Sequence, residues 1–334
     1  MSGPADIRSN LDRLAARVFS GAVAEGSLLR LTGGASQQTW SVDIVTPAGT
    51  LPLILRHIPG DRAEIERTVG PETEAILMRL AGAHGVPEPG VRHVLEPADG
   101  LGRGFLSDRI AGETLARRIL RDAEFDAIRP RLAGLSGAAM AGIHAIPLDQ
   151  LPSLLVKYAQ DELADLRASY RTTGARVPTF EAAFRWLEDH MPQRPTTPCL
   201  VHGDFRNGNL IFGPEGIRAV LDWELAHLGD PAQDLGWITV NSWRFGARDH
   251  PVGGFGSIED MMAGYVAAGG AAIDTARVLF WQALGSLRWG VMCRQMSWRD
   301  ETAPPLVVER AMIGRRVSET ELDLLDIVAP DRRP

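Results

Sequence analysis

Three short apolar runs enclose one polar loop in the middle of the chain, and this arrangement constrains the fold more than any other feature. The runs cover residues 199–202, 210–212 and 217–221, and their apolar and β-branched residues are typical of strands. The first two runs are joined by GDFRNGN, which is rich in polar residues and glycine. Rigid flanking strands position a loop better than free coil does. We therefore expect this loop to hold its polar side chains at fixed separations.

The loop and the residues after it supply three oxygen-bearing side chains. Asp204 and Asn209 lie five positions apart, and Asp222 ends the apolar run AVLD, where a strand terminus would aim its carboxylate into the same space. A carboxylate base, an amide oxygen and a second carboxylate are what magnesium-assisted phosphoryl transfer requires. The base orients the attacking hydroxyl, and the other two groups hold the ion against the phosphates. The pattern indicates phosphoryl transfer.

The composition is that of a globular chain without a nucleic-acid or membrane partner. The 334 residues are 45% hydrophobic and 23% charged, which suffices for two cores, and the formal net charge is −7 without any block of like charges. The N-terminus lacks a signal pattern, and Asp274 and Arg277 interrupt the apolar stretch 271–287, so we expect a cytoplasmic protein. Cys199 and Cys293 are expected to be small buried thiols.

The character of the sequence changes about a third of the way along the chain. Extended segments are expected within residues 28–56, one helix within 71–85, and a further extended pair near 91–95 and 105–110. Helical spacing dominates after that point. Helices are expected around residues 132–143, 155–170, 180–190, 258–268 and 274–296. The sequence thus predicts a small antiparallel sheet with a helix, followed by a mainly helical part.

The polar loop also carries a family resemblance. The stretch HGDFRNGN from His202 to Asn209 matches the H-G-D-x-x-x-x-N catalytic loop of the aminoglycoside phosphotransferase family, a branch of the protein-kinase-like fold. LDWE and GDPAQDLGW match the family's metal-binding segment and the segment after it, and NSWRFG is similar to members linked with acyl-CoA dehydrogenases. The resemblance implies an α+β bilobal fold, with a sheet-and-helix lobe over residues 1–106 and a larger, mainly helical lobe over residues 107–334.

The resemblance implies a role for each matching position. Asp204 is expected to be the catalytic base, while Asn209 and Asp222 ligate Mg²⁺. His202 and Asp234 are expected to support the catalytic loop. The stretch LTGGASQQTW is expected to cover the phosphates of ATP. The positions expected to contact the nucleotide are Gly33, Gly34, Ser36, Arg56 and Glu74.

Three of these nucleotide positions have plainer interpretations. A glycine pair such as Gly33-Gly34 could be an ordinary hairpin turn, and Glu74 could be a solvated helix residue. The family also places a lysine on the strand that Arg56 ends, whereas the only lysine among 35 basic residues is Lys157, in the helical part. An arginine keeps the charge and can hold both phosphate and carboxylate through its planar fork. We therefore expect Arg56 to neutralise phosphate charge and to pair with Glu74.

The predicted function is ATP- and magnesium-dependent phosphorylation of a hydroxyl on a small molecule. Residues 111–334 contain 29 acidic and 24 basic residues, a balance that favours a neutral or anionic acceptor, such as a hydroxyacyl thioester, over a polycationic aminoglycoside. The arginines expected near the acceptor are Arg244, Arg248, Arg288, Arg294 and Arg299. The alternatives are an antibiotic phosphotransferase, a nucleotide-binding pseudoenzyme that acts as an interaction module, and a metal-dependent hydrolase. No oligomeric state is predicted.

Overall fold

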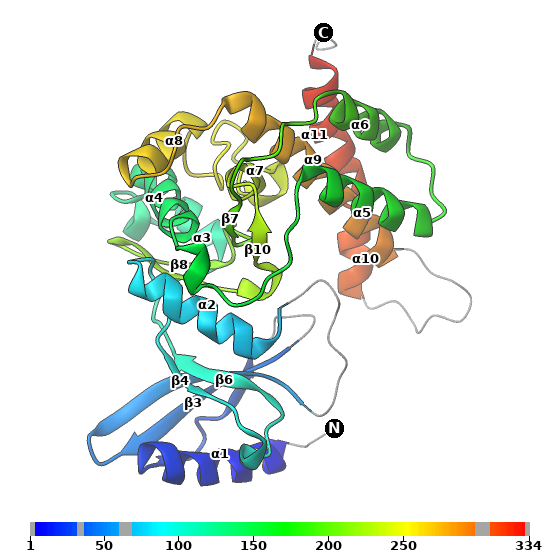
Figure 1. Ribbon diagram of the computed structural model, residues 1–334. Coiled ribbons are helices and arrows are strands. Elements are labelled where there is room, and N and C mark those ends of the chain that lie inside the picture. The colour runs from blue at the N-terminus through cyan, green and yellow to red at the C-terminus, as the bar shows by residue number, and fades with distance from the viewer. Residues whose placement is uncertain (1–3, 32–36, 60–68, 298–307, 331–334) are drawn as a thin grey trace.

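The computed structural model describes residues 4–31, 37–59, 69–297 and 308–330, which form two lobes (Figure 1). The N-terminal lobe contains an antiparallel sheet in the order β1-β3-β4-β6-β5, with β2 paired to β3. The strands are β1 (Ala22–Val23), β2 (Leu29–Leu31), β3 (Gln38–Thr46), β4 (Gly49–Ile58), β5 (Val91–Val94) and β6 (Arg103–Asp108). The predicted small antiparallel sheet is therefore confirmed.

Two helices lie on opposite sides of this sheet, α1 (Pro4–Phe19) and α2 (Pro71–Ala83) (Figure 1). Side chains alternate between the faces of a strand. On β4, Leu53 and Leu55 are fully buried in the core shared with α1. Ile54 and Arg56 project to the other face, toward the helical lobe. The strand thereby presents Arg56 at the junction of the lobes. The sequence pattern did not reveal α1.

The C-terminal lobe is mainly helical, with two small strand pairs near the sheet. β7 (Cys199–Val201) pairs with β10 (His227–Gly229), and β8 (Leu210–Gly213) pairs with β9 (Gly216–Val220), all antiparallel. The described helices are α3 (Ala116–Arg121), α4 (Leu132–His144), α5 (Ala159–Thr172), α6 (Pro178–Asp189), α7 (Ala232–Trp237), α8 (Ile258–Ala267), α9 (Thr275–Ser297), α10 (Val308–Gly314) and α11 (Val317–Val328). The predicted helices correspond to α4, α5, α6, α8 and α9.

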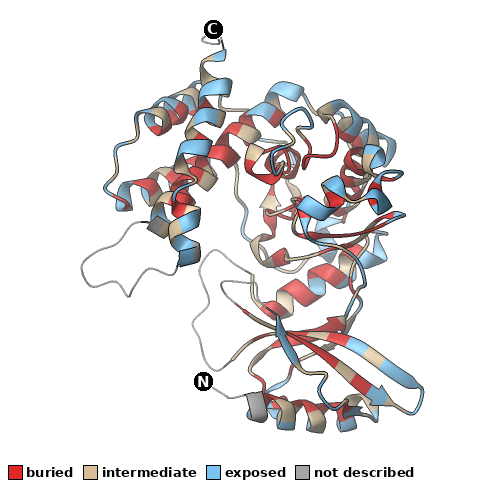
Figure 2. Ribbon diagram, turned by 180° about the vertical axis from the view of Figure 1, so that it is seen from behind, coloured by how far each residue is buried: buried red, intermediate tan, exposed pale blue. Residues whose placement is uncertain are grey.

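Two large buried clusters and a small one of Trp237, Val240 and Trp243 stabilise the helical lobe, whose buried residues are red in Figure 2. One large cluster joins α2 to α4, α8 and the strands of the polar loop, and the other joins α5, α6, α9 and α11. Helices α4 and α8 meet at backbone distance, because a Cβ on Gly137 would lie 2.0 Å from the Met261 carbonyl oxygen. Since α2 shares the first cluster, the sheet lobe is anchored to the helical lobe through buried apolar surface.

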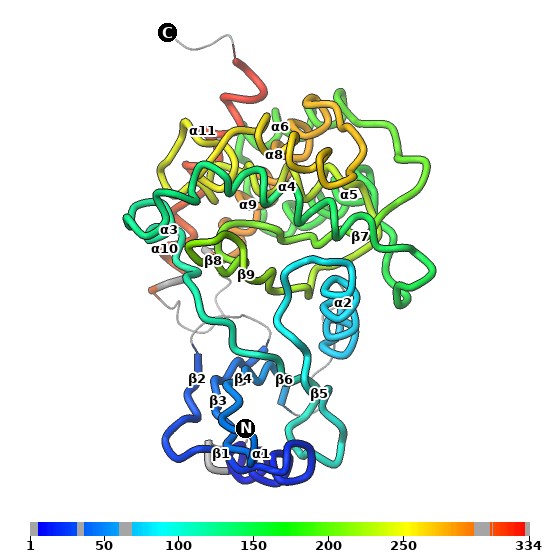
Figure 3. Tube along the Cα trace, turned by 90° about the vertical axis from the view of Figure 1, so that its left-hand side faces the viewer, coloured from blue at the N-terminus to red at the C-terminus, as the bar shows by residue number. Residues whose placement is uncertain are grey.

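The chain passes between the lobes after β6, and α2 lies between the sheet and the helical lobe (Figure 3). The predicted boundary after residue 106 falls inside β6, which continues to Asp108, and the division at this residue stays a prediction. Cys293 is buried as expected, whereas Cys199 is only partly buried because it begins a strand of a two-stranded sheet. Among the described helices, none combines the length and the apolar character that crossing a membrane requires.

Candidate active site

The polar loop between β7 and β8 is braced by the carboxylate of Asp234 at the start of α7. Asp234 accepts the backbone N–H groups of His202 at 2.8 Å and of Gly203 at 2.9 Å. Gly203 has φ of +80°, and a Cβ there would lie 2.5 Å from the carbonyl oxygen of Leu225. Only glycine therefore fits the close approach of this loop to the segment after Asp222.

His202 is held inside the loop through both ring nitrogens. Nε2 lies 3.1 Å from the carbonyl oxygen of Leu221, which can only accept, so Nε2 carries the proton and Nδ1 accepts the backbone N–H of Asp204 at 3.2 Å. Burial lowers the pKa of His202, and the carboxylates of Asp234 and Asp204 oppose this only in part. The ring is neutral and has no free nitrogen to take a proton from a substrate.

Three donors fix the carboxylate of Asp204. The indole Nε1 of Trp237 donates to Oδ1 at 2.7 Å, and the guanidinium Nε of Arg206 donates to the same oxygen at 3.2 Å. The amide Nδ2 of Asn209 donates to Oδ2 at 2.6 Å. Because these donors come from the loop itself and from α7, the carboxylate is held in one orientation before any substrate binds.

Arg56 lies at the centre of a charged cluster between the lobes. Its Nη1 is 3.2 Å from Glu74 Oε1, and its Nη2 contacts the carboxylates of Asp222 and Glu224. Gln37 completes the cluster, because it accepts from Arg56 Nε at 3.0 Å and donates to Glu74 Oε2 at 3.2 Å. The structure thus brings Arg56 and Glu74 together, and it places both against Asp222.

One guanidinium faces three carboxylates in this cluster, and the pKa values reflect the imbalance. Burial by itself would lower the pKa of Arg56, but Glu74, Asp222 and Glu224 together raise it above its usual value. Burial raises the pKa of Glu74 to about 7, although Arg56 opposes the rise. Arg56 therefore stays charged, while Glu74 is a carboxylate that takes up a proton near neutral pH.

A cavity of about 450 Å³ lies between the sheet and the polar loop, and Arg56, Asn209 and Asp222 line it. Its size is in the usual range for a small-molecule site. One part of its wall is apolar and the other is charged. The apolar wall is formed by Leu31, Ile54, Met78, Phe105, Ile211 and Leu221. Such a cavity suits a ligand with a flat apolar ring at one end and anionic groups at the other.

The oxygen atoms at the charged end fit a hard divalent cation. The amide nitrogen of Asn209 is used by Asp204, which leaves the amide oxygen for another partner. Asp222 has left-handed backbone angles, φ 71° and ψ 64°, a conformation that costs energy in a non-glycine residue and clusters at functional sites. Amide and carboxylate oxygens are ligands that Mg²⁺ accepts. Among the described residues, no three His, Cys, Asp or Glu side chains converge in a metal-binding group.

Sequence reasoning missed several residues that the structure brings to the site. Gln37 donates to Glu74, and Trp237 and Arg206 donate to Asp204. The Nε2–H of His144 donates to the carboxylate of Asp234 at 3.1 Å. Burial raises and His144 lowers the pKa of Asp234, and the net effect is a lowered value. Arg206 carried the clearest sequence signal, as a basic residue two positions after Asp204. The predicted nucleotide residues outside the described ranges are Gly33, Gly34 and Ser36.

The sequence matches the model of a known protein family over most of its length. The model of the family described as "Phosphotransferase enzyme family" (APH) matches residues 27–271, which include the polar loop, Arg56 and Asp222. The chain belongs to this phosphotransferase family. The fold expected from the aminoglycoside phosphotransferase resemblance, with its sheet lobe and helical lobe, is therefore confirmed.

The chain is similar to parts of much longer curated proteins. Acyl-CoA dehydrogenase family member 10 of Mus musculus is 31% identical over 228 residues, which are 63% of this chain and 20% of that protein. Acyl-CoA dehydrogenase family member 11 of Rattus norvegicus is 33% identical over 101 residues, which are 29% of this chain and 13% of that protein. The chain thus spans at most about a fifth of these two relatives.

Solved structures of phosphotransferases share the fold. A protein of Ralstonia eutropha JMP134, provisionally named an aminoglycoside phosphotransferase, superposes with a TM-score of 0.73 at 21% identity, covering 96% of this chain and 98% of its own. Aminoglycoside phosphotransferase APH(4)-Ia, in a ternary complex with ADP and hygromycin B, has a TM-score of 0.62 at 17% identity, covering 97% of this chain and 100% of its own. At these identities the likeness establishes the fold alone.

Proposed function

We propose that the protein transfers the γ-phosphoryl group of ATP to a hydroxyl of a small neutral or anionic molecule, with Mg²⁺ as cofactor. The observation that carries the proposal is the cavity lined by Arg56, Asn209 and Asp222 beside Asp204. Its apolar wall suits a purine ring, and its charged end suits the phosphates. The complex of APH(4)-Ia with ADP supports a nucleotide as the occupant.

Asp204 is the proposed base. As the acceptor oxygen attacks the γ-phosphorus, the carboxylate takes the hydroxyl proton, the bond to the bridging oxygen breaks, and ADP leaves. Trp237 and Asn209 keep the carboxylate aimed during this step. Asp234 and His202 hold the backbone of the loop, so we assign them positioning roles only. The catalysis is mainly orientation and electrostatics.

Asn209, through its amide oxygen, and Asp222 are the proposed ligands of Mg²⁺. When bound there, the ion would offset the negative charge of the phosphates. Arg56 adds a fixed positive charge at the same end of the cavity, and Glu74 and Gln37 keep its guanidinium in place. Gly33, Gly34 and Ser36 remain the proposed cover of the phosphates, as the sequence predicts.

Acceptor screening tests the proposal. The purified protein is incubated with magnesium ATP and with hydroxyacyl thioesters, simple hydroxy acids or kanamycin-like aminoglycosides, and ADP release is compared with the reaction without acceptor. The names of the acyl-CoA dehydrogenase relatives support the thioesters as the first compounds to try. We expect acceptor-dependent ADP release and a phosphomonoester product by mass spectrometry. ATP binding without transfer to any acceptor would contradict the proposal and favour a pseudoenzyme, and exclusive transfer to aminoglycosides would contradict the acceptor class.

A further inference from the structure

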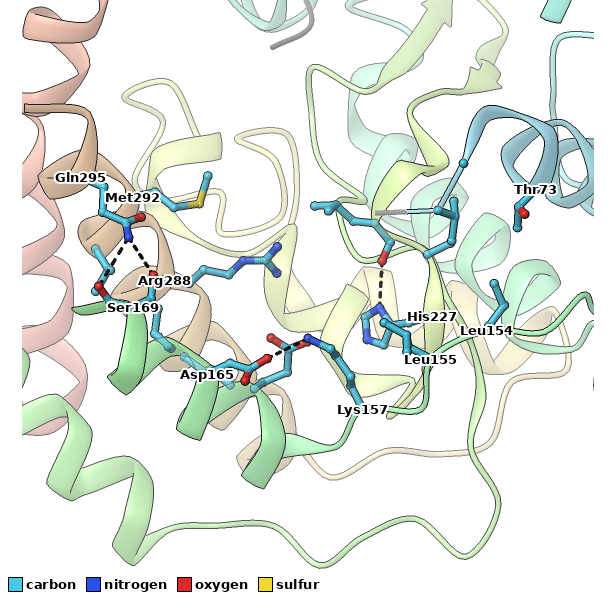
Figure 4. A pocket seen from close by; sticks show the side chains of 18 of the residues that line it. Thr73, Leu154, Leu155, Lys157, Asp165, Ser169, His227, Arg288, Met292 and Gln295 are labelled. Carbon is cyan, nitrogen blue, oxygen red and sulfur yellow. Dashed lines mark hydrogen bonds and ion pairs between the residues drawn. The ribbon is translucent and has the colours of Figure 1, made fainter. Parts of the chain in front are cut away.

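A second cavity of about 520 Å³ lies mainly in the helical lobe, and the start of α2 and Arg103 of β6 close it on the side of the sheet lobe (Figure 4). It shares no lining residue with the nucleotide cavity. Helices α5 and α9 form two of its walls, and β10 with the segment before α5 forms another. We call it the helical-lobe cavity. Its volume suits a small organic molecule.

The helical-lobe cavity leads to the catalytic loop. A small hollow next to it is lined by Gly203 and Trp237, and it shares Glu162, Leu284 and Arg288 with the larger cavity. Trp237 is the residue whose indole N–H donates to Asp204. The residues that the two hollows share therefore lie next to the tryptophan that holds the proposed base.

Most charged groups around this cavity are already neutralised. Lys157 pairs with Asp165 at 2.9 Å. Arg103 holds Glu72 through two contacts of 2.9 Å and 2.6 Å. These pairs leave little net charge for a ligand to recognise on their side of the cavity.

Arg288 differs from these residues. Its guanidinium lies over the indole of Trp237, 5.1 Å from the ring centroid, and it points into the cavity (Figure 4). Among the residues that the structure describes, no carboxylate forms an ion pair with it. Glu162 lines the same cavity and likewise has no ion pair within the described part of the chain. Of the five arginines expected near the acceptor, Arg299 lies outside the described residues. Among the other four, only Arg288 lines the helical-lobe cavity or the small hollow next to it.

We propose that Arg288 binds an oxyanion of the acceptor, a carboxylate or a phosphate, while the acceptor hydroxyl faces Asp204. The inference rests on the proposed phosphotransferase function and names the acceptor class for it. A guanidinium fork matches both oxyanions, and the face of Trp237 keeps it oriented. Among the described lining residues, Glu162 is the one carboxylate without an ion pair, whereas a polycationic aminoglycoside carries several ammonium groups. The site therefore disfavours such an acceptor.

Matched acceptors test this assignment. The probes are ω-hydroxyalkanoates of several chain lengths, their neutral amides, the corresponding amino alcohols, and ω-hydroxyalkyl phosphates. The variants are Arg288→Gln, Arg288→Lys and Glu162→Gln, with Arg171→Gln as a matched control, because Arg171 is an exposed arginine of α5 that does not line the cavity. KM and kcat are measured for each, and binding of the same probes is measured by calorimetry in the presence of a non-hydrolysable ATP analogue.

We expect the wild-type protein to prefer the oxyanion probes over the amides. Arg288→Gln should reduce kcat/KM for the oxyanions about 10- to 100-fold, mainly through KM, and should reduce the ratio of oxyanion to amide turnover toward one. Arg288→Lys should recover part of the preference. Glu162→Gln should lower KM for the oxyanions, because a nearby negative charge is removed. Preference for carboxylate over phosphate, or the reverse, would identify which oxyanion the site accepts.

An unchanged oxyanion-to-amide ratio in Arg288→Gln would overturn the inference, as would tighter binding of the amino alcohols than of the oxyanions. Equal losses for all probes in Arg288→Gln would also overturn it, since they would indicate disturbance of Trp237 and Asp204 alone. Arg288-dependent binding of oxyanions without any turnover would leave the inference standing and contradict the proposed function. Acceptor turnover that is unchanged in Arg288→Gln would contradict the inference and leave the proposed function standing.

Discussion

Replacing Arg56 with alanine would leave three carboxylates facing one another between the lobes. The side chain of Arg56 is 18% exposed and that of Glu74 is 1% exposed, whereas Asp222 and Glu224 keep partial contact with solvent. Breaking a buried ion pair by removing one partner typically costs about 3–5 kcal/mol. Because Glu74 can take up a proton, we expect the lower end of this range. Arg56→Ala should reduce the free energy of unfolding by about 3 kcal/mol near pH 7.

The stability deficit of Arg56→Ala should depend on pH with a defined sign. Burial raises the folded-state pKa of Glu74 to about 7 in the wild-type protein, so its protonated form favours folding, and this contribution is lost as pH rises through that value. Without Arg56 the pKa of Glu74 rises further, and the loss continues to higher pH. The deficit relative to wild type should therefore widen above pH 7, by at most about 1.4 kcal/mol per pH unit.

Urea denaturation at pH 6 and pH 8 measures this deficit. Glu74→Gln should recover part of the stability that Arg56→Ala loses, because it removes the buried charge that has lost its partner. Arg92→Ala is the control on the same sheet, since its pair with Asp108 is exposed on the arginine side, and it should cost less than about 1 kcal/mol. A deficit that is the same at both pH values and is not relieved by Glu74→Gln would refute the reasoning.

Two further predictions concern the support of the catalytic loop. Trp237→Phe keeps an aromatic ring but removes the indole donor to Asp204. Steady-state kinetics should show turnover about 10- to 100-fold lower, with nucleotide affinity unchanged by calorimetry. Unaltered turnover would mean that this hydrogen bond does not serve the reaction. Asp234→Asn should lower the free energy of unfolding by about 1–3 kcal/mol at pH 7. This loss should shrink in acid, because Asp234 of the wild type becomes protonated there. Equal losses at pH 7 and pH 3 in urea titrations would contradict this prediction.

The local pattern of the sequence predicted the parts of the site that depend on short spacing. Asp204 and Asn209 lie in one loop, and the five-residue step between them led to the prediction of phosphoryl transfer. The apolar run before Arg56 likewise indicated a strand that ends at this arginine, and β4 continues two residues further, to Ile58. Helices with clear apolar spacing, such as α4 and α9, were predicted for the same reason.

The contacts that sequence reasoning missed join distant segments. Trp237 reaches Asp204 across 33 residues, and His144 reaches Asp234 across 90. Such contacts depend on how α4 and α7 pack, which local periodicity does not encode. His144 also forms a hydrogen bond with the Tyr265 hydroxyl at 3.0 Å, so both of its ring nitrogens have partners. β10 has only three residues, too few for a strand pattern to stand out.

The central claim is that Asp204 is the base of a phosphoryl transfer from ATP. The most direct test compares wild type and Asp204→Asn on one acceptor that the wild type phosphorylates, with turnover measured by ADP release and nucleotide affinity by calorimetry. Asparagine keeps the shape of the side chain but is not a carboxylate base. We predict that turnover falls roughly 100-fold or more, the usual size of a lost general base, while nucleotide affinity is retained. Near-wild-type turnover by Asp204→Asn would contradict the account.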